Sequence, residues 1–257
     1  MQGIGCNTVN PKDTANFLSF LQQLRTTTTG NKLIISVPVS APFADASGSP
    51  STNLSAFKDV LDFITIMNYD TGSNHSFGVG PNSPLDDSCA PTSGQRGSAT
   101  RLLDAWSAAG MPLDQIVLGV PAYGYGYSVS KKLAFTSGSI LASYPAYNVS
   151  NTPPGDKWSG VGGIDVCGNN EGPGGVYTYW GLMEEGFLNT DGTTKTGIAY
   201  RYDNCSQTVG TFRHTQCKKR LTRCSSHTYI IPPLKFMRLS ITLNLSRQKV
   251  ISSIQKV

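Results

Sequence analysis

Residues 63–70 read FITIMNYD, a run of five apolar or β-branched residues followed at once by Asn68-Tyr69-Asp70. Such a short, nearly continuous apolar run predicts a strand that is buried on both faces, as strands of parallel sheets are. LIISVPV at Leu33–Val39 and IVLGV at Ile116–Val120 have the same character. The sequence therefore predicts three buried strands.

Helical patterns separate these strands. Pro11–Leu24 is predicted as a helix with Asn10 as its cap, and Ser98–Ala109 as a second helix with Trp106 on its buried face. A short helical turn is expected at Ser55–Val60. Alternating strands and helices at this spacing indicate an α/β fold with a parallel sheet. In barrels of this type, the chemistry lies where strands end at their carboxyl edge.

The candidate site residues lie at those strand ends. Met67 and Tyr69 share a strand face because side chains alternate along a strand, and Asp70 follows at the exit. Tyr123 follows the third strand in Pro121-Ala122-Tyr123-Gly124. A phenol beside a carboxylate can donate to a carbonyl oxygen and orient an amide. The alternative is purely structural: a strand that ends in a turn, with Asp70 capping the next element.

Charge and pattern divide the chain further. Tyr125 to about Asp203 loses the strand–helix rhythm and is predicted to form an inserted α+β module. The last 49 residues hold ten Lys or Arg and no acidic residue, whereas the first 208 carry a formal charge of −5. We therefore predict domains at 1–124 and 125–208, and a basic tail at 209–257 outside the fold. The alternative is that this tail forms a divergent last strand and closing helix.

Six cysteines without metal-ligand spacing and five N-glycosylation sequons favour a secreted protein with disulfides. The first residues, MQGIGCNTVN, do not read as a signal peptide, and no apolar run of 18 residues predicts a membrane span. We expect no metal and no cofactor. The basic tail lacks interleaved aromatic residues, so no nucleic-acid partner is expected.

Several ordered motifs resemble glycoside hydrolase family 18 chitinases of the fungal type. They are DFITIMNYD ending at Asp70, GPNSPL at 80–85, and GMPLDQIVLGVPAYGYGY at 110–127. The resemblance implies a partial (β/α)8 TIM barrel, with strands five to seven, and the family's α+β insertion domain. It also implies an extracellular monomer that acts on chitin or chito-oligosaccharides.

The resemblance further implies roles for the site residues. Tyr69 would donate to the N-acetyl carbonyl of the sugar, Asp70 would position that group, and Met67 and Tyr123 would line the substrate site. This family is the substrate-assisted exception among glycosidases, with the sugar's own N-acetyl oxygen as nucleophile. Tyr69 and Asp70 are therefore the candidate catalytic residues, and Met67 and Tyr123 the candidate substrate-binding residues.

The general acid of the family lies in a D-x-x-D-x-D-x-E run that this sequence lacks; we expect the chain to begin just after it. The only glutamates are Glu171, Glu184 and Glu185, all in the inserted module. The chain as given is therefore predicted not to cleave chitin. One alternative is a chitin-binding, lectin-like protein without catalysis, and another is a non-functional gene product with a mistranslated tail.

Other aromatic residues and the histidines receive structural interpretations. Side chains predicted to pack in the core of the inserted module are Tyr125, Tyr127, Trp158 and Trp180. The three histidines are predicted to be solvated loop or tail residues: His75, His214 and His227.

Overall fold

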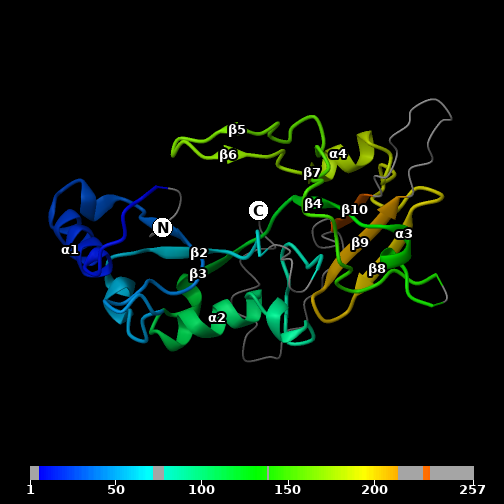
Figure 1. The fold of residues 1–257 in the computed structure, drawn as a ribbon. Coiled ribbons are helices and arrows are strands. Elements are labelled where there is room, and N and C mark those ends of the chain that lie inside the picture. Colours follow the sequence, from blue (N-terminus) through cyan, green and yellow to red (C-terminus); the bar gives the residue numbers. More distant parts are fainter. Residues whose placement is uncertain (1–5, 72–77, 138, 214–227, 232–257) are drawn as a thin grey trace. The chain divides into compact units, whose positions relative to one another are not determined.

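The computed structural model describes residues 6–71, 78–137, 139–213 and 228–231 (Figure 1). Contacts divide the chain into two compact units. The first holds the described residues up to Asn68 together with Ala99–Gly119, and the second holds Tyr69–Ser98 and Val120 onward. Each unit is described by itself.

The first unit contains a three-stranded parallel sheet in the order β1-β2-β3. Its strands are β1 (Ser36–Val39), β2 (Phe63–Met67) and β3 (Ile116–Gly119). Ile64 and Ile66 of β2 are completely buried. All three predicted strands are confirmed, although β1 begins three residues later than expected.

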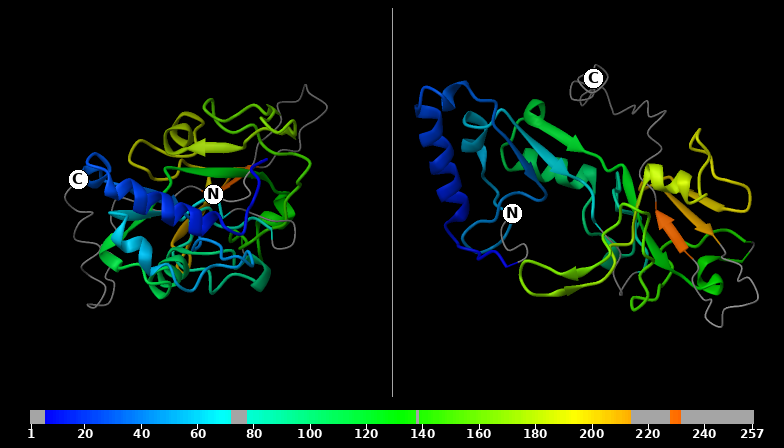
Figure 2. Two further views of the ribbon diagram at one scale, coloured as in Figure 1. Left: turned by 90° about the vertical axis from the view of Figure 1, so that its left-hand side faces the viewer. Right: turned by 90° about the horizontal axis from the view of Figure 1, so that it is seen from above.

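Two helices lie beside this sheet (Figures 1 and 2), and their buried side chains share one hydrophobic cluster with Ile64 and Ile66. They are α1 (Asp13–Thr26) and α2 (Ala99–Ala108), with 3-10 turns at Gly30–Lys32, Ser55–Asp59 and Leu113–Gln115. Trp106 of α2 is fully buried, and its indole N–H donates to the Ser40 carbonyl at 2.8 Å. The prediction of Trp106 as a core residue is confirmed.

The second unit is built around a five-stranded antiparallel sheet in the order β7-β4-β10-β9-β8. The same unit holds a two-stranded hairpin and two short helices (Figure 1). The elements are β4 (Tyr123–Ser128), α3 (Lys131–Ala134), β5 (Gly163–Ile164), β6 (Asn170–Glu171), β7 (Val176–Thr178), α4 (Tyr179–Glu184), β8 (Ala199–Asp203), β9 (Thr208–Arg213) and β10 (Thr228–Ile231), with a 3-10 turn at Thr92–Gly94.

The predicted boundary at residue 208, between the inserted module and a tail outside the fold, is wrong. β9 begins at Thr208 and runs to Arg213, and Phe212 is buried within the unit. β10 lies between β4 and β9 and pairs antiparallel with both. The expectation of an unpatterned tail is therefore wrong for these two segments, because charge composition carries no information about backbone pairing. The rest of the predicted tail lies outside the described residues.

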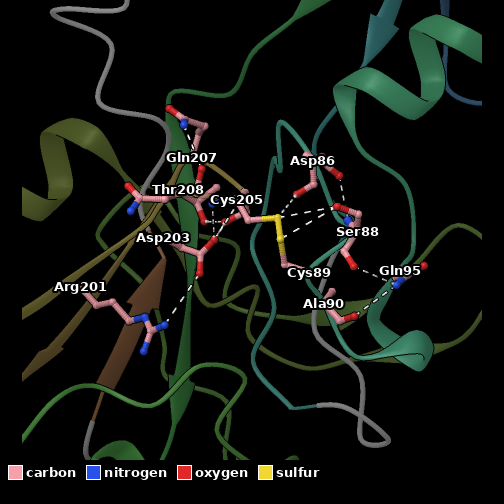
Figure 3. Close-up of a disulfide and its surroundings, with 12 residues drawn as sticks. Asp86, Ser88, Cys89, Ala90, Gln95, Arg201, Asp203, Cys205, Gln207 and Thr208 are labelled. Carbon is pink, nitrogen blue, oxygen red and sulfur yellow. Dashed lines mark hydrogen bonds and ion pairs between the residues drawn. A yellow bond between two sulfur atoms is a disulfide. The ribbon is translucent and has the colours of Figure 1, made fainter.

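A disulfide between Cys89 and Cys205 joins the loop after β2 to the turn between β8 and β9 (Figure 3). The backbone N–H of Leu85 donates to the Ser206 carbonyl at 2.8 Å beside it. In the turn, Asp203 accepts hydrogen bonds from the backbone N–H groups of Cys205 and Ser206. The segment from Tyr69 to Ser98 is thus fastened to the sheet of the second unit.

Within the described residues, no helix has the length and apolar character needed to cross a membrane.

Candidate functional site

The site begins where β2 ends. Tyr69 and Asp70 are the second and third residues after Met67, as predicted. Tyr123 is not an extension of the third strand: β3 ends at Gly119, and Tyr123 is the first residue of β4 in the antiparallel sheet. Pro121 lies between the two strands, and proline has no N–H with which to continue a ladder.

The carboxylate of Asp70 is the centre of the site. Its Oδ1 accepts a hydrogen bond from the Tyr123 hydroxyl at 2.6 Å and another from the Tyr125 hydroxyl at 2.9 Å. The rings of Tyr69 and Tyr123 meet edge to face with centroids 6.3 Å apart. One exposed carboxylate therefore accepts two tyrosine hydroxyls, and a third tyrosine packs against one of the two donors.

The electrostatics keep the two donors protonated. Burial raises the pKa of both Tyr123 and Tyr125 above the usual tyrosine value, and the hydrogen bond to Asp70 raises it further. Asp70 Oδ2 and the Tyr69 hydroxyl form no hydrogen bond within the described part of the chain. A ligand would therefore meet an open acceptor on Asp70 and an open donor on Tyr69.

The side chain of Asn82 forms hydrogen bonds to the backbone of both Asp70 and Tyr123. Its Oδ1 accepts the backbone N–H of Asp70 at 3.0 Å, and its Nδ2 donates to the Tyr123 carbonyl at 3.1 Å. The side chain is only 3% exposed. Asp70 has a φ of 58°, in the left-handed region that non-glycine residues rarely occupy. Asn82 thus ties a strained Asp70 to the first residue of β4, and is a positioning residue.

We expect Asn82→Ala to lower the free energy of unfolding by about 1–3 kcal/mol, because it leaves a buried donor or acceptor without its partner. Urea denaturation followed by circular dichroism measures this change. Asn31→Ala, at an exposed asparagine, is the control and should change stability by less than about 0.5 kcal/mol. Equal effects of the two substitutions would contradict the positioning role.

Of the four predicted site residues, the structure brings together Tyr69, Asp70 and Tyr123. Met67 belongs to the first unit, where it is half-buried at the end of β2, and its part in the site stays a prediction. Tyr125 was predicted to lie in the core but reaches Asp70. Its spacing of two from Tyr123 on one strand is the signal that could have revealed this.

The remaining aromatic predictions divide in two. Tyr127 packs against the buried cluster around Phe212, as predicted. Trp158 and Trp180 are exposed on the surface, so their prediction as core residues is wrong. The three histidines, His75, His214 and His227, lie outside the described residues. Across the described ranges, no group of three or more His, Cys, Asp or Glu is placed to hold a metal ion.

The three glutamates are all exposed on the second unit. Glu171 lies on β6, Glu184 ends α4 and forms an ion pair with Lys157 at 2.8 Å, and Glu185 follows it. A carboxyl that protonates a leaving group near neutral pH needs an apolar pocket. The geometry gives that environment to none of the three.

Comparison with known proteins finds a family model and two close relatives that match most of this chain. The family model of glycosyl hydrolases family 18 matches residues 4–231. A chitinase-like effector of Moniliophthora roreri is 49% identical over 210 residues, which are 80% of this chain and 50% of that protein. The corresponding protein of Moniliophthora perniciosa is 47% identical over 209 residues, covering 80% and 47%. This chain therefore spans about half the length of these curated relatives.

Among solved structures, a chitinase from Rhizomucor miehei superposes with a TM-score of 0.70. It is 28% identical in sequence, and the match covers 89% of this chain and 57% of that one.

Proposed function

The chain belongs to glycosyl hydrolases family 18, and on that basis we propose that it binds β-1,4-linked N-acetylglucosamine chains at Asp70 and leaves them uncut. The supporting observation is the arrangement of Asp70, whose Oδ1 accepts two tyrosine hydroxyls while Oδ2 faces no protein donor among the described residues. Two phenols that stay protonated hold an exposed carboxylate in one orientation, ready to accept from a ligand.

In the proposed complex, Asp70 Oδ2 accepts from the N-acetyl N–H or a hydroxyl of the sugar. The Tyr69 hydroxyl donates to the N-acetyl carbonyl. The ring of Tyr123 forms a wall against the sugar, where its C–H face can stack. In an enzyme of the substrate-assisted type, these contacts would hold the N-acetyl oxygen against the anomeric carbon.

Turnover requires a further group, an acid that protonates the leaving oxygen. The chain has only the three exposed glutamates described above, and the D-x-x-D-x-D-x-E run is missing from its sequence. We therefore propose binding without cleavage for this chain. The names of its relatives, chitinase-like effectors, favour a second candidate function. In that case the protein is a chitin-binding, lectin-like member of the family that has lost catalysis altogether, rather than a chitinase whose acid is not in this chain.

Two further proposals concern the domains of the chain and the location of the protein. We propose that the second unit from β4 onward is the insertion domain of the family and that the first unit is part of a TIM barrel. We also propose an extracellular location, supported by the disulfide between Cys89 and Cys205, because disulfides persist in oxidising compartments.

Isothermal titration of the purified chain with chitotetraose tests the binding proposal. Asp70→Asn removes the charge but keeps the shape, and we expect the affinity to fall by about 10- to 100-fold, the range for a lost hydrogen bond to a charged group. Asp114→Asn, at an exposed aspartate of the first unit, is the matched control and should leave the affinity unchanged. Equal affinity in both variants would sink the proposal.

A further inference from the structure

Three of the five N-glycosylation sequons lie in the part of the chain that the structure describes. They begin at Asn53, Asn148 and Asn204, whereas those at Asn74 and Asn244 lie outside it. Each of the three described asparagines is exposed. The transferase that attaches the sugar reads the hydroxyl two residues after the asparagine. A sequon is short enough to arise by chance, so the surroundings of each asparagine decide whether it can be modified.

The sequon at Asn148 has its amide nitrogen free. Its Oδ1 accepts the backbone N–H of Ser150 at 3.0 Å, which closes a turn inside the sequon. Because Oδ1 faces this turn, Nδ2 is the open end of the amide, and it has no hydrogen-bond partner within the described residues. Val149 and Ser150 are exposed as well. All three residues of this sequon are therefore accessible to a transferase.

The sequon at Asn53 has the same arrangement. Its Oδ1 accepts the backbone N–H of Ser55 at 3.2 Å and the Ser55 hydroxyl at 2.8 Å. Leu54 between them is buried, and its N–H donates to the Ala109 carbonyl at 2.6 Å. The backbone is thereby fixed to the first unit, while Nδ2 of the exposed Asn53 side chain meets no acceptor among the described residues.

Attachment of a sugar at these two positions keeps the hydrogen bonds of the turns. In N-glycosylation, an oligosaccharide carried on a lipid diphosphate is transferred to Nδ2. A bond forms between Nδ2 and the anomeric carbon, and the bond from that carbon to a diphosphate oxygen breaks. The diphosphate leaves with the electron pair, and Nδ2 gives up one proton to solvent. Since Oδ1 stays an acceptor, Asn53 and Asn148 keep their contacts with Ser55 and Ser150.

The sequon at Asn204 differs, because its other two residues are held within the fold. Cys205 is bonded to Cys89 (Figure 3). Ser206 is only 3% exposed, and its hydroxyl lies 2.7 Å from the hydroxyl of Thr208. A transferase needs the hydroxyl that is buried here. Once the disulfide has closed, this sequon is therefore inaccessible.

A sugar at Asn148 is attached far from the Asp70 site. The N–H of Asn148 donates at 2.8 Å to the carbonyl of Ser128, the last residue of β4. Tyr123, which donates to Asp70, is the first residue of the same strand. A strand rises about 3.3 Å per residue, so the two ends of β4 lie about 17 Å apart. The modification should therefore leave ligand binding at Asp70 unchanged.

We propose that Asn53 and Asn148 carry N-linked oligosaccharides, whereas the disulfide beside Asn204 withholds that residue from modification. Because the transferase acts in the secretory pathway, use of the two sites in nature rests on the proposed extracellular location. At Asn148 the sugar also covers Val149, which is 44% exposed, and so increases the solubility of this surface.

The test maps the sugars on the secreted chain. Yeast secretes the chain behind a leader peptide, which imposes entry into the secretory pathway whatever the natural location. Asn74→Gln/Asn244→Gln is the background, so that only the three described sequons remain. Release of the sugars by peptide N-glycosidase in heavy-oxygen water converts each modified asparagine to a labelled aspartate, which peptide mass spectrometry detects. We expect label at Asn53 and Asn148 and none at Asn204.

Four variants test the separate steps of the argument. Asn148→Gln and Ser150→Ala should each remove one oligosaccharide from the intact protein, because both destroy the same sequon. Asn151→Gln is the matched control, at an exposed asparagine three residues further on that begins no sequon, and should leave the mass of sugar unchanged. Cys89→Ser removes the disulfide but keeps the sequon at Asn204, where label should now be found.

The outcomes separate this inference from the earlier proposals. Absence of label at Asn53 and Asn148 in the secreted chain overturns the inference and leaves the Asp70 proposal untouched, since titration with chitotetraose tests that one. Label at Asn204 as strong as at Asn148, with the disulfide intact, overturns the role of the bond. Chitotetraose affinity that rises when the sugars are removed contradicts their distance from the Asp70 site. Label in yeast but none in protein from its native source refutes the extracellular location and leaves the two acceptor sites standing.

Discussion

A chromogenic chitobioside is expected to remain uncut when it is incubated with this chain. General acid catalysis contributes about 10²–10⁴-fold to such reactions, and the D-x-x-D-x-D-x-E run that we expect to carry the acid does not occur in this sequence. The three glutamates are exposed, and Glu184 is engaged with Lys157. In the proposed complex the Asp70 site orients an N-acetyl group, but orientation alone leaves the leaving oxygen without a proton.

The measurement is release of chromophore over the blank, with an active chitinase as the positive control. Asp70→Ala is the diagnostic variant. Turnover well above the blank that disappears in Asp70→Ala would overturn the prediction, because it would locate catalysis at this site without the expected acid. Turnover that persists in Asp70→Ala would point to a contaminating enzyme and calls for the same assay on repurified protein.

Removal of the disulfide between Cys89 and Cys205 is expected to cost about 4–5 kcal/mol of unfolding free energy. The bond closes a loop with a sequence separation of 116 residues. In the chain-entropy model, a loop of about 100 residues contributes about 4.7 kcal/mol, because the cross-link restricts the unfolded chain. The segment held by the bond includes Asn82, which accepts the backbone N–H of Asp70, so the Asp70 site should weaken together with the fold.

The variant for this test is Cys89→Ser/Cys205→Ser, with stability measured by urea denaturation and affinity by titration with chitotetraose. Asn148→Ser, at an exposed asparagine of the same unit, is the control substitution. A loss of stability below about 1 kcal/mol would show that the unfolded chain is little restricted by this bond.

Local sequence patterns predicted the first unit well. The apolar runs located all three strands, and the helical spacing located α1 and α2 to within two residues at each end. These elements follow from periodicity and burial, which are properties of short segments. The positions of Tyr69 and Asp70 directly after β2 followed from the same patterns. The motif resemblance pointed to the family that the comparisons show.

Only the tertiary structure decided how distant segments meet. β10 enters the middle of a sheet between β9, the strand before it in sequence, and β4, which lies far earlier in the chain. Asn82 bridges Asp70, 12 residues before it, to Tyr123, 41 residues after it. Whether a tryptophan is buried or exposed depends on which other segments pack against it. The local sequence therefore does not show that Trp106 is buried and Trp180 exposed. Pairing and exposure are long-range properties, because hydrogen bonds between strands and contacts between side chains join residues that no local pattern relates.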